Sequence, residues 1–359
     1  MNTPAADQRL AAFQEIPIID IHPLLHGDEQ ARREVAAELG RAARDVGFFQ
    51  MVGHGIDGSL REGLIHQAKR FFAQSEAIKM ERYIGLYHHH RGYVPPGEES
   101  PDPAKPDMKE AFDLAFELPS DDPDVMAGTP LLGPNPWPDL DGFKDPVAAY
   151  YDAAYHVGRA LMGGFAMALG LAPQQLLQHV NKPPSQLRMI HYPYNPNAED
   201  AQGIGAHTDY ECFTLLLPTA PGLEVMNGKG EWIDVPFKEG ALIVNIGDML
   251  EIWSNGEFVA TSHRVRKVKE ERYSFPLFFA CDYHTVVEPL PELVARHGKA
   301  RYSALKAGDH LFAQTIQTFR YLRERLAKGE IALPEGAREV GSLGQHGKHK
   351  APGNEETNR

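Results

Sequence analysis

The chain has 359 residues, and 36 Lys and Arg against 49 Asp and Glu leave a formal net charge of −13, which argues against nucleic acid or an anionic membrane as the main partner. A hydrophobic content of 42% can fill a substantial core, while two cysteines are too few for a disulfide framework or a cysteine-rich zinc site. The start carries no basic and apolar leader and no run reaches roughly 18 apolar residues, so we expect a soluble, cytoplasmic protein that spans no membrane.

The first third of the chain is typical of a mixed α/β segment. Residues 16–21 (IPIIDI) and 47–52 (GFFQMV) are short apolar runs that predict strands. Asp28 precedes a stretch with apolar residues at helical spacing, which predicts a helix N-cap, and a second helical stretch runs from about 59 to 80. Prolines then recur through 83–140, a pattern that excludes long regular elements and is typical of an irregular lid.

A helix is expected over 146–171, and it is the last element of an N-terminal region at 1–182. After this region the sequence pattern changes. Residues 183–290 contain short apolar runs between Gly, Asn and Pro residues, and such runs predict strands of a jelly roll, sandwich or barrel. The runs are QLRMIHY, CFTLLL, GLEVM, EWIDV, ALIVNI, MLEIW, FVATSHRVRKV and YSFPLFFACDY.

The end of the chain returns to helical patterns. Residues 291–335 form a C-terminal helical segment with an amphipathic helix over about 302–328, and the Gly-, His- and Lys-rich tail at 336–359 is expected to be disordered. The fold class that these patterns predict is mainly β with flanking helices. One β core is expected, with helices from both flanks packed around it.

Metal-binding residues are indicated in the segment GIGAHTDYECF. His207 and Asp209 stand at i and i+2, which in an extended chain places both side chains on one face. This spacing alone is weak, because 17 histidines and 49 acidic residues make roughly two such matches by chance. His26-Gly27-Asp28 is a match of this kind, already explained as a helix start.

His263, on another predicted strand, adds a third ligand. Two imidazoles and one carboxylate with open positions form the facial triad of non-haem Fe(II) oxygenases. The three residues alone are equally compatible with a strand-edge His207 paired to Asp209 and a satisfied core His263. Arg272 and Ser274 share a face of the next strand and suit a carboxylate, while a salt bridge from Arg272 to a neighbouring glutamate is the alternative.

Together these residues resemble the signature of Fe(II)/2-oxoglutarate-dependent dioxygenases of the isopenicillin N synthase-like group. The resemblance extends over roughly residues 16–330, because further segments have family counterparts in the same order. They are IPIIDI, DVGFFQMVGHGI, RGYVPPGEE, RMIHYPYNP and NIGDMLEIWSNGEFVATSHRV. It implies a double-stranded β-helix (jelly-roll) core at 183–290, an N-terminal α/β cover and a C-terminal helix.

The resemblance also implies the cofactors. His207, Asp209 and His263 would bind Fe(II), and Arg272, Ser274 and Tyr192 would bind the distal carboxylate of 2-oxoglutarate. The reaction would use O2 and couple decarboxylation of 2-oxoglutarate to succinate and CO2 with hydroxylation, desaturation or cyclisation of a small-molecule substrate, with ascorbate as a stimulant. Many relatives have Asn where this chain has Ile190, which puts any contact made by that Asn in doubt.

The same resemblance points to six residues on the substrate side, each of which also has a purely structural interpretation as core or solvated surface. Of these, Arg91 would favour a substrate carboxylate. The run His88-His89-His90 is interpreted as a surface loop, since consecutive loop residues point in different directions, and both cysteines are expected to be buried and structural. The substrate-side residues are Arg91, Tyr93, Tyr210, Glu211, Phe213 and Phe278.

Several alternatives stay open at this point. An iron-dependent oxidase of the same fold without 2-oxoglutarate and an ethylene-forming enzyme would keep the same signature. A zinc hydrolase with the same ligands, or a jelly-roll protein that only binds a small molecule, would keep the fold. The sequence does not decide the substrate or whether the protein is a monomer or a weak dimer.

Overall fold

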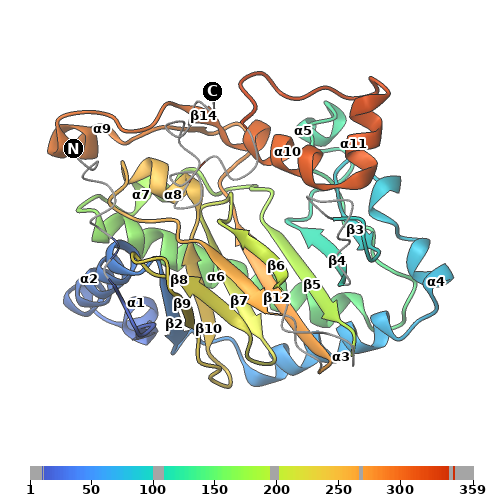
Figure 1. The fold of residues 1–359 in the computed structure, drawn as a ribbon, viewed down its shortest axis with the longest axis horizontal. Helices are drawn as coiled ribbons and strands as arrows, with labels where there is room; N and C mark the ends of the chain where they lie inside the picture. The colour runs from blue at the N-terminus through green and yellow to red at the C-terminus, as the bar shows by residue number, and fades with distance from the viewer. Residues whose placement is uncertain are drawn as a thin grey trace, which may run out of the picture.

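The computed structural model describes residues 10, 12–99, 109–194, 202–266, 270–338 and 343. At its centre an eight-stranded sheet packs against a four-stranded sheet, and helices surround them (Figure 1). The large sheet contains, in spatial order, β1 (Ile18–Asp20), β2 (Phe48–Val52), β10 (Leu242–Ile246), β7 (Phe213–Pro218), β12 (Arg272–Phe279), β5 (Gln186–Tyr192), β4 (Glu110–Ala115) and β3 (Gly92–Val94). The small sheet contains β6 (Gln202–His207), β11 (His263–Arg266), β8 (Leu223–Met226) and β9 (Trp232–Asp234).

The helices come from both flanks of the chain, and α6 is the longest of those described. The predicted N-cap is confirmed at the start of α2, where the Asp28 side chain accepts from the Ala31 amide at 2.9 Å. The helices are α1 (His22–His26), α2 (Glu29–Asp45), α3 (Gly58–Phe72), α4 (Glu76–Met80), α5 (Pro123–Met126), α6 (Lys144–Ala168), α7 (Gln174–Leu177), α8 (Asp248–Trp253), α9 (Pro291–His297), α10 (Ala307–Thr318) and α11 (Arg320–Ala327). A 3-10 turn, η1, covers Ile84–Leu86, and β13 (Val286–Val287) pairs with β14 (Leu305–Lys306).

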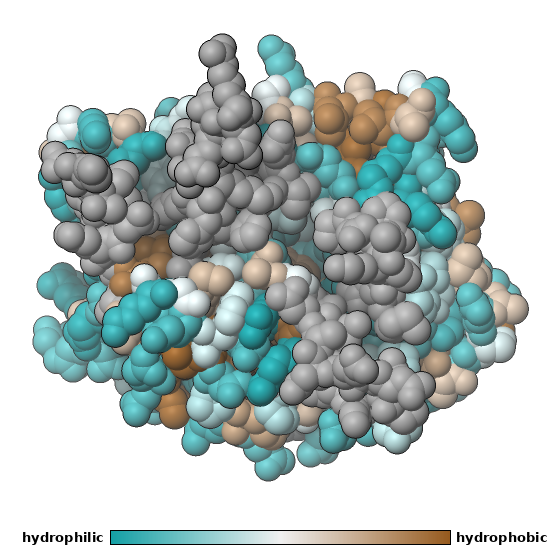
Figure 2. Space-filling view, viewed as in Figure 1, coloured by the Kyte–Doolittle hydropathy of each residue, from teal (hydrophilic) through white to brown (hydrophobic). Residues whose placement is uncertain are grey.

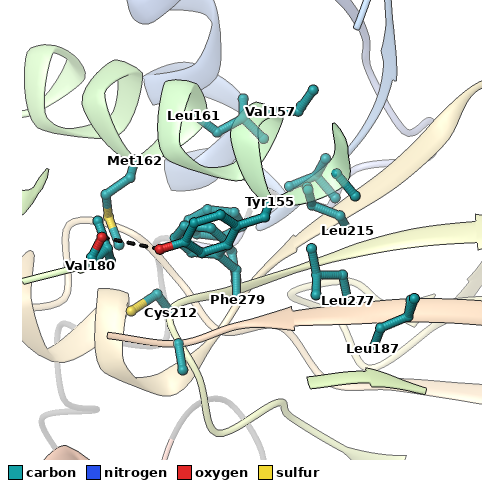
Figure 3. Packing of buried hydrophobic residues seen from close by; sticks show 14 of the residues in the cluster. Tyr155, Val157, Leu161, Met162, Val180, Leu187, Cys212, Leu215, Leu277 and Phe279 are labelled. Atoms are coloured by element: carbon teal, nitrogen blue, oxygen red, sulfur yellow. Dashed lines mark hydrogen bonds between the residues drawn. The ribbon is translucent and has the colours of Figure 1, made fainter. Parts of the chain in front are cut away.

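Helix α6 covers the outer face of the large sheet, and this layer is the main hydrophobic core (Figures 1 and 3). Along β12 the apolar residues at 273, 275, 277 and 279 face this core, because side chains alternate along a strand. Phe279 stacks on the Tyr155 ring of α6, with ring centroids 5.5 Å apart. At Gly158 a Cβ atom would lie 2.4 Å from the Phe279 ring, so glycine is required for this close approach. The opposite, inner face of β12 therefore carries Arg272, Ser274 and Phe278.

The N-terminal region contributes strands to both edges of the large sheet. β1 pairs with β2, and β2 with β10, while at the other edge β3 pairs with β4 and β4 with β5. The boundary that we place at residue 182 therefore divides the sequence but does not divide the large sheet. Strands from both sides of this boundary form one layer.

Three element predictions are wrong in detail. The run MLEIW, taken as a strand, is helix α8; all six residues of that helix are buried, so no alternation distinguishes strand from helix. The helical stretch 59–80 is two helices, α3 and α4, and the C-terminal helix is α10 and α11, separated at the extended Phe319.

The C-terminal tail lies mostly outside the described residues, and so does the expectation that it is disordered. Within the described part, the Arg338 carbonyl accepts from Gln314 and Gln317 of α10 at 3.2 and 2.9 Å. Leu343 is buried against the main core. Among the described residues, none of the helices has the length and apolar character needed to cross a bilayer.

Hydrophobic residues appear in separate groups on the face shown in Figure 2, with hydrophilic residues between them. The large hydrophobic side chains that are exposed belong to different elements, for example Ile18 on β1, Met126 on α5 and Val286 on β13. The described surface therefore gives no reason to place a partner on one continuous apolar face.

Candidate metal centre

The three predicted metal ligands lie close together at the ends of two paired strands of the small sheet. His207 ends β6, His263 begins β11, and the two residues are paired directly across the small sheet. Asp209 lies in the turn after β6, and its Oδ1 is 3.6 Å from the Nε2 atom of each histidine. The three ligand atoms lie within 4.8 Å of one another. This donor set has the composition of a facial triad, a type of site that leaves coordination positions open for other ligands.

Hydrogen bonds orient both imidazoles toward this centre. The Nδ1 atom of His207 is 2.8 Å from the Gly205 carbonyl, and that of His263 is 3.2 Å from the Thr261 carbonyl. Because a carbonyl only accepts, each Nδ1 must carry the proton in these bonds. The Nε2 atoms are then free of a proton in the neutral rings, which is the form that binds a metal.

Hydrogen bonds also orient the Asp209 carboxylate. Its Oδ2 accepts from the Thr214 hydroxyl and, at 2.7 Å, from the Asn245 amide, so Oδ1 is the oxygen left for a metal. Burial acts to raise the pKa of Asp209, but the two imidazoles and these two donors lower it overall. The carboxylate is therefore ionised and ready to bind a cation. The residues present fit a divalent iron ion by donor type, orientation and charge.

The predicted 2-oxoglutarate residues also lie together, on the inner face of the large sheet. Arg272 pairs with Tyr192 across β12 and β5, and its guanidinium lies 4.7 Å from the Tyr192 ring centre. Arg272 and Ser274 line a small cavity between the sheets, with Val265 of β11. Arg272 is buried and its Nε has no hydrogen-bond partner among the described residues. A buried guanidinium with an unpartnered donor fits a carboxylate ligand.

Three of the substrate-side candidates lie near the triad. Phe278 is on the inner face of β12, opposite Thr214, which binds Asp209. Tyr210 and Glu211 follow Asp209 directly and are both half-buried. Burial, and then the Asp209 carboxylate, raise the pKa of Glu211 to about 8, against the opposing effect of Arg188.

The structure places the other three candidates away from the triad. Arg91 is buried, and its guanidinium donates to the carbonyls of Leu131 and Gly133 and to the Asn135 side chain. These bonds connect two parts of the lid segment at 83–140. Tyr93 donates to Glu110 on the outer face of the sheet, and Phe213 stacks in the core under α6.

One further correction concerns the histidine run. The interpretation of residues 88–90 as a surface loop is wrong for His90, which is buried and bound through Nδ1 to the Tyr321 hydroxyl at 2.6 Å. Burial lowers the pKa of His90 to about 3, so this ring is a neutral packing residue between the lid and α11. Both cysteines, as expected, are buried and free.

Sequence reasoning missed a buried charge network on β5. Arg188 binds both oxygens of Asp113 at 2.8 Å and Glu99 at 2.7 Å. Arg188 shares the inner face with Ile190 and Tyr192, two and four positions on, so strand alternation could have found it. Its partners lie 75 and 89 residues away and no local pattern links them.

Comparison with known proteins agrees with this geometry. The family profile described as 2OG-Fe(II) oxygenase superfamily matches residues 183–280, and the one described as non-haem dioxygenase in morphine synthesis N-terminal matches 16–140. The chain belongs to the 2OG-Fe(II) oxygenase superfamily. The 2-oxoglutarate-Fe(II) type oxidoreductase hxnY of Emericella nidulans is 31% identical over 90% of this chain and 95% of that one.

Other relatives of this oxygenase cover it to a similar extent. The homoarginine-6-hydroxylase 2-ODD-C23 of Glycine max is 34% identical over 86% of this chain and 98% of that one. A full-length Neurospora crassa protein, crystallised in complex with alpha-KG, has a TM-score of 0.71 and 28% identity, covering 87% of this chain and 96% of that one. The expected jelly-roll core with flanking helices is confirmed. The oxygenase is a dioxygenase that uses Fe(II) and 2-oxoglutarate, as the resemblance implies.

Proposed function

We propose that His207, Asp209 and His263 hold the catalytic iron of this 2-oxoglutarate-dependent dioxygenase. The observation that carries the proposal is the convergence of two Nε2 atoms and one carboxylate oxygen within 4.8 Å. Their other polar atoms are fully used by backbone carbonyls, Thr214 and Asn245, which fixes their orientation. When bound, iron and 2-oxoglutarate supply dioxygen activation, with release of succinate and CO2.

Arg272, Ser274 and Tyr192 would hold the distal carboxylate of 2-oxoglutarate. Arg272 offers a planar pair of donors, Ser274 a hydroxyl on the same face, and Tyr192 stacks under the guanidinium and limits its movement. Arg272 and Ser274 line the cavity between the sheets, and Tyr192 is paired with Arg272 across β12 and β5. These three contacts would hold the co-substrate in one orientation.

The substrate would be a small molecule that binds over Phe278 and beside Tyr210 and Glu211, and the reaction would be hydroxylation of a C–H bond. Three curated relatives at 32 to 34% identity are named homoarginine-6-hydroxylases. The Neurospora crassa protein has been crystallised with thymine as well as alpha-KG. Homoarginine and thymine are both small and polar, which supports a substrate of this size. Arg91, Tyr93 and Phe213 are left out of the proposed contacts because their side chains are used elsewhere.

The test is an anaerobic titration of the purified protein with Fe(II) and then 2-oxoglutarate, followed by an aerobic assay of succinate. We expect a visible absorption band on addition of 2-oxoglutarate and one succinate for each substrate hydroxylated. His207→Ala should lose the band, and the exposed Glu239→Gln should keep it. Absence of the band in the wild-type protein, or substrate loss without matching succinate, would refute the assignment.

We further propose that the enzyme works in the cytoplasm, without nucleic acid or membrane, as a monomer or weak dimer. The net charge of −13 and two free, buried cysteines support this setting. Size-exclusion chromatography with light scattering across protein concentrations tests the oligomeric state. A stable trimer or tetramer at low concentration would contradict the proposal.

A further inference from the structure

A histidine beside the proposed co-substrate residues contacts two carboxylates on the outer face of the large sheet. His191 precedes Tyr192 on β5, and it is 9% exposed. Its Nδ1 lies 2.8 Å from Oε1 of Glu110, and its Nε2 lies 2.8 Å from Oε1 of Glu271. The ring also stacks on Tyr273, its direct partner on β12, with centroids 4.8 Å apart. His191 therefore has a fixed position between two acidic side chains.

Glu110 is the buried member of this cluster. The Lys79 ammonium and the Tyr93 hydroxyl donate to its other oxygen. Burial acts to raise the pKa of Glu110, but the hydrogen bonds from His191, Lys79 and Tyr93 lower it overall, so the group is an ionised anchor. Because carboxylate oxygens accept, both bonds of His191 form together when both ring nitrogens carry hydrogen. His191 thus connects this anchor to the exposed Glu271.

Glu271 directly precedes Arg272, yet the two side chains do not pair. Arg272 is 3% exposed and forms no ion pair among the described residues, and its Nη1 donates to the Pro221 carbonyl at 3.4 Å. Glu271 accepts instead from His191 and, at 3.2 Å, from the Tyr273 hydroxyl. Burial and Glu271 raise the pKa of Tyr273, so this hydroxyl keeps the proton that it donates. The ion pair that the sequence leaves open is therefore not formed.

The position of Glu271 gives its side chain room to turn. It lies one residue before β12 begins, and its side chain is 54% exposed. A buried guanidinium without an anionic partner attracts a neighbouring carboxylate, because burial makes an unpaired charge costly. Without its present hydrogen bonds, Glu271 would compete for Arg272.

We propose that His191 is a positioning residue that keeps Glu271 on the outer face of the sheet and so leaves Arg272 free for the distal carboxylate of 2-oxoglutarate. The proposal rests on the role of Arg272 in the function proposed above. An ion pair between Glu271 and Arg272 would have to break each time the co-substrate binds, and its affinity would fall accordingly. His191 and Tyr273 prevent this competition by holding the Glu271 carboxylate with two hydrogen bonds.

The experiment measures the dissociation constant of 2-oxoglutarate by anaerobic titration of the visible band in the Fe(II)-loaded protein. His191→Phe keeps an aromatic ring and loses both nitrogens. We expect the dissociation constant to rise roughly 10-fold, the lower end of the range for one hydrogen bond to a charged group. The KM for 2-oxoglutarate should rise in parallel, while turnover at saturating 2-oxoglutarate stays unchanged. Adding Glu271→Gln to this variant should restore the affinity to within about 2-fold of wild type, because the competing charge is gone.

Two further variants control for a general disturbance of the cluster. Lys79→Met removes the other cationic partner of Glu110 and leaves the bonds of Glu271 in place. It should lower the thermal stability of the metal-free protein and keep the dissociation constant within about 2-fold of wild type. Tyr273→Phe removes the second bond to Glu271 and keeps the ring. It should raise the dissociation constant less than His191→Phe does, and Glu271→Gln should reverse this rise as well.

Unchanged affinity in a folded His191→Phe protein would overturn the proposal, and so would a loss that Glu271→Gln does not repair. An equal loss in Lys79→Met would also overturn it, because the effect would then be structural. Where His191→Phe does not fold, Tyr273→Phe decides in the same way, and unchanged affinity there overturns the proposal.

Two measurements report on the proposed function separately. If the wild-type protein forms no band, or if Arg272→Lys binds 2-oxoglutarate as wild type does, the proposed role of Arg272 fails. If the band forms and Arg272→Lys weakens binding while His191→Phe does not, only the positioning role of His191 fails.

Discussion

Replacing Asn245 by leucine removes an amide that holds one oxygen of the proposed iron ligand Asp209. The donor and acceptor atoms are 2.7 Å apart, and the two residues are 3% and 5% exposed. A hydrogen bond to a buried charged group contributes about 1.5 to 3 kcal/mol, which corresponds to roughly 10- to 150-fold in an equilibrium constant. Outer partners of metal ligands generally change metal affinity by about 10- to 100-fold. We therefore expect the dissociation constant for Fe(II) to rise by about 10- to 100-fold.

The assay is an anaerobic Fe(II) titration in competition with a chelator, paired with thermal unfolding of the metal-free protein. Thr214→Val should give a similar loss, since its hydroxyl binds the same oxygen, and the double variant should be less than additive. Thr219→Val, the same change just beyond the other end of β7, is the matched control, because that hydroxyl binds the Tyr273 backbone. An Fe(II) affinity within about twofold of wild type in a folded Asn245→Leu protein would refute the reasoning.

Three further predictions test the site and its limits. His207→Ala or His263→Ala should abolish iron binding and turnover, whereas His26→Ala, in α1, should leave both intact; iron loss in the latter would contradict the choice of ligands. Arg272→Lys should raise the apparent KM for 2-oxoglutarate by about 10-fold or more with little change in thermal stability, because a point charge replaces a two-donor fork. Arg91→Met should lower the free energy of unfolding by roughly 1.5 to 3 kcal/mol in urea titrations, through lost bonds to buried carbonyls, without changing substrate KM; a selective rise in KM would restore the substrate role.

Strand periodicity explains why part of the site could be predicted from the sequence. Arg272 and Ser274 are two residues apart on β12, and an extended chain directs such a pair to one face. His207 and Asp209 have the same spacing, although Asp209 lies just beyond the end of β6. The same rule also covered Arg188 on the face of Tyr192, but the sequence analysis did not apply it there. Periodicity failed at α8, where every residue is buried and no alternation remains.

Charge and exposure were less predictable. Arg91 in a proline-rich loop has the pattern of a solvated or substrate-facing cation, yet the fold buries it against three backbone and side-chain acceptors. His90 is buried likewise, because α11 returns to cover the lid. Burial depends on which distant segments pack over a residue, and no local pattern reports it.

The sequence by itself determined the donor types of the candidate site: two imidazoles, a carboxylate and an Arg-Ser pair can be listed before any fold is known. Only the tertiary structure decided that His263 pairs directly with His207 across the small sheet and that Thr214 and Asn245 hold the far oxygen of Asp209. It also placed His310 from α10 against Tyr210. The physical reason is range, since spacing along one strand is set by backbone geometry, whereas contacts between distant strands and helices are set by packing of the whole core.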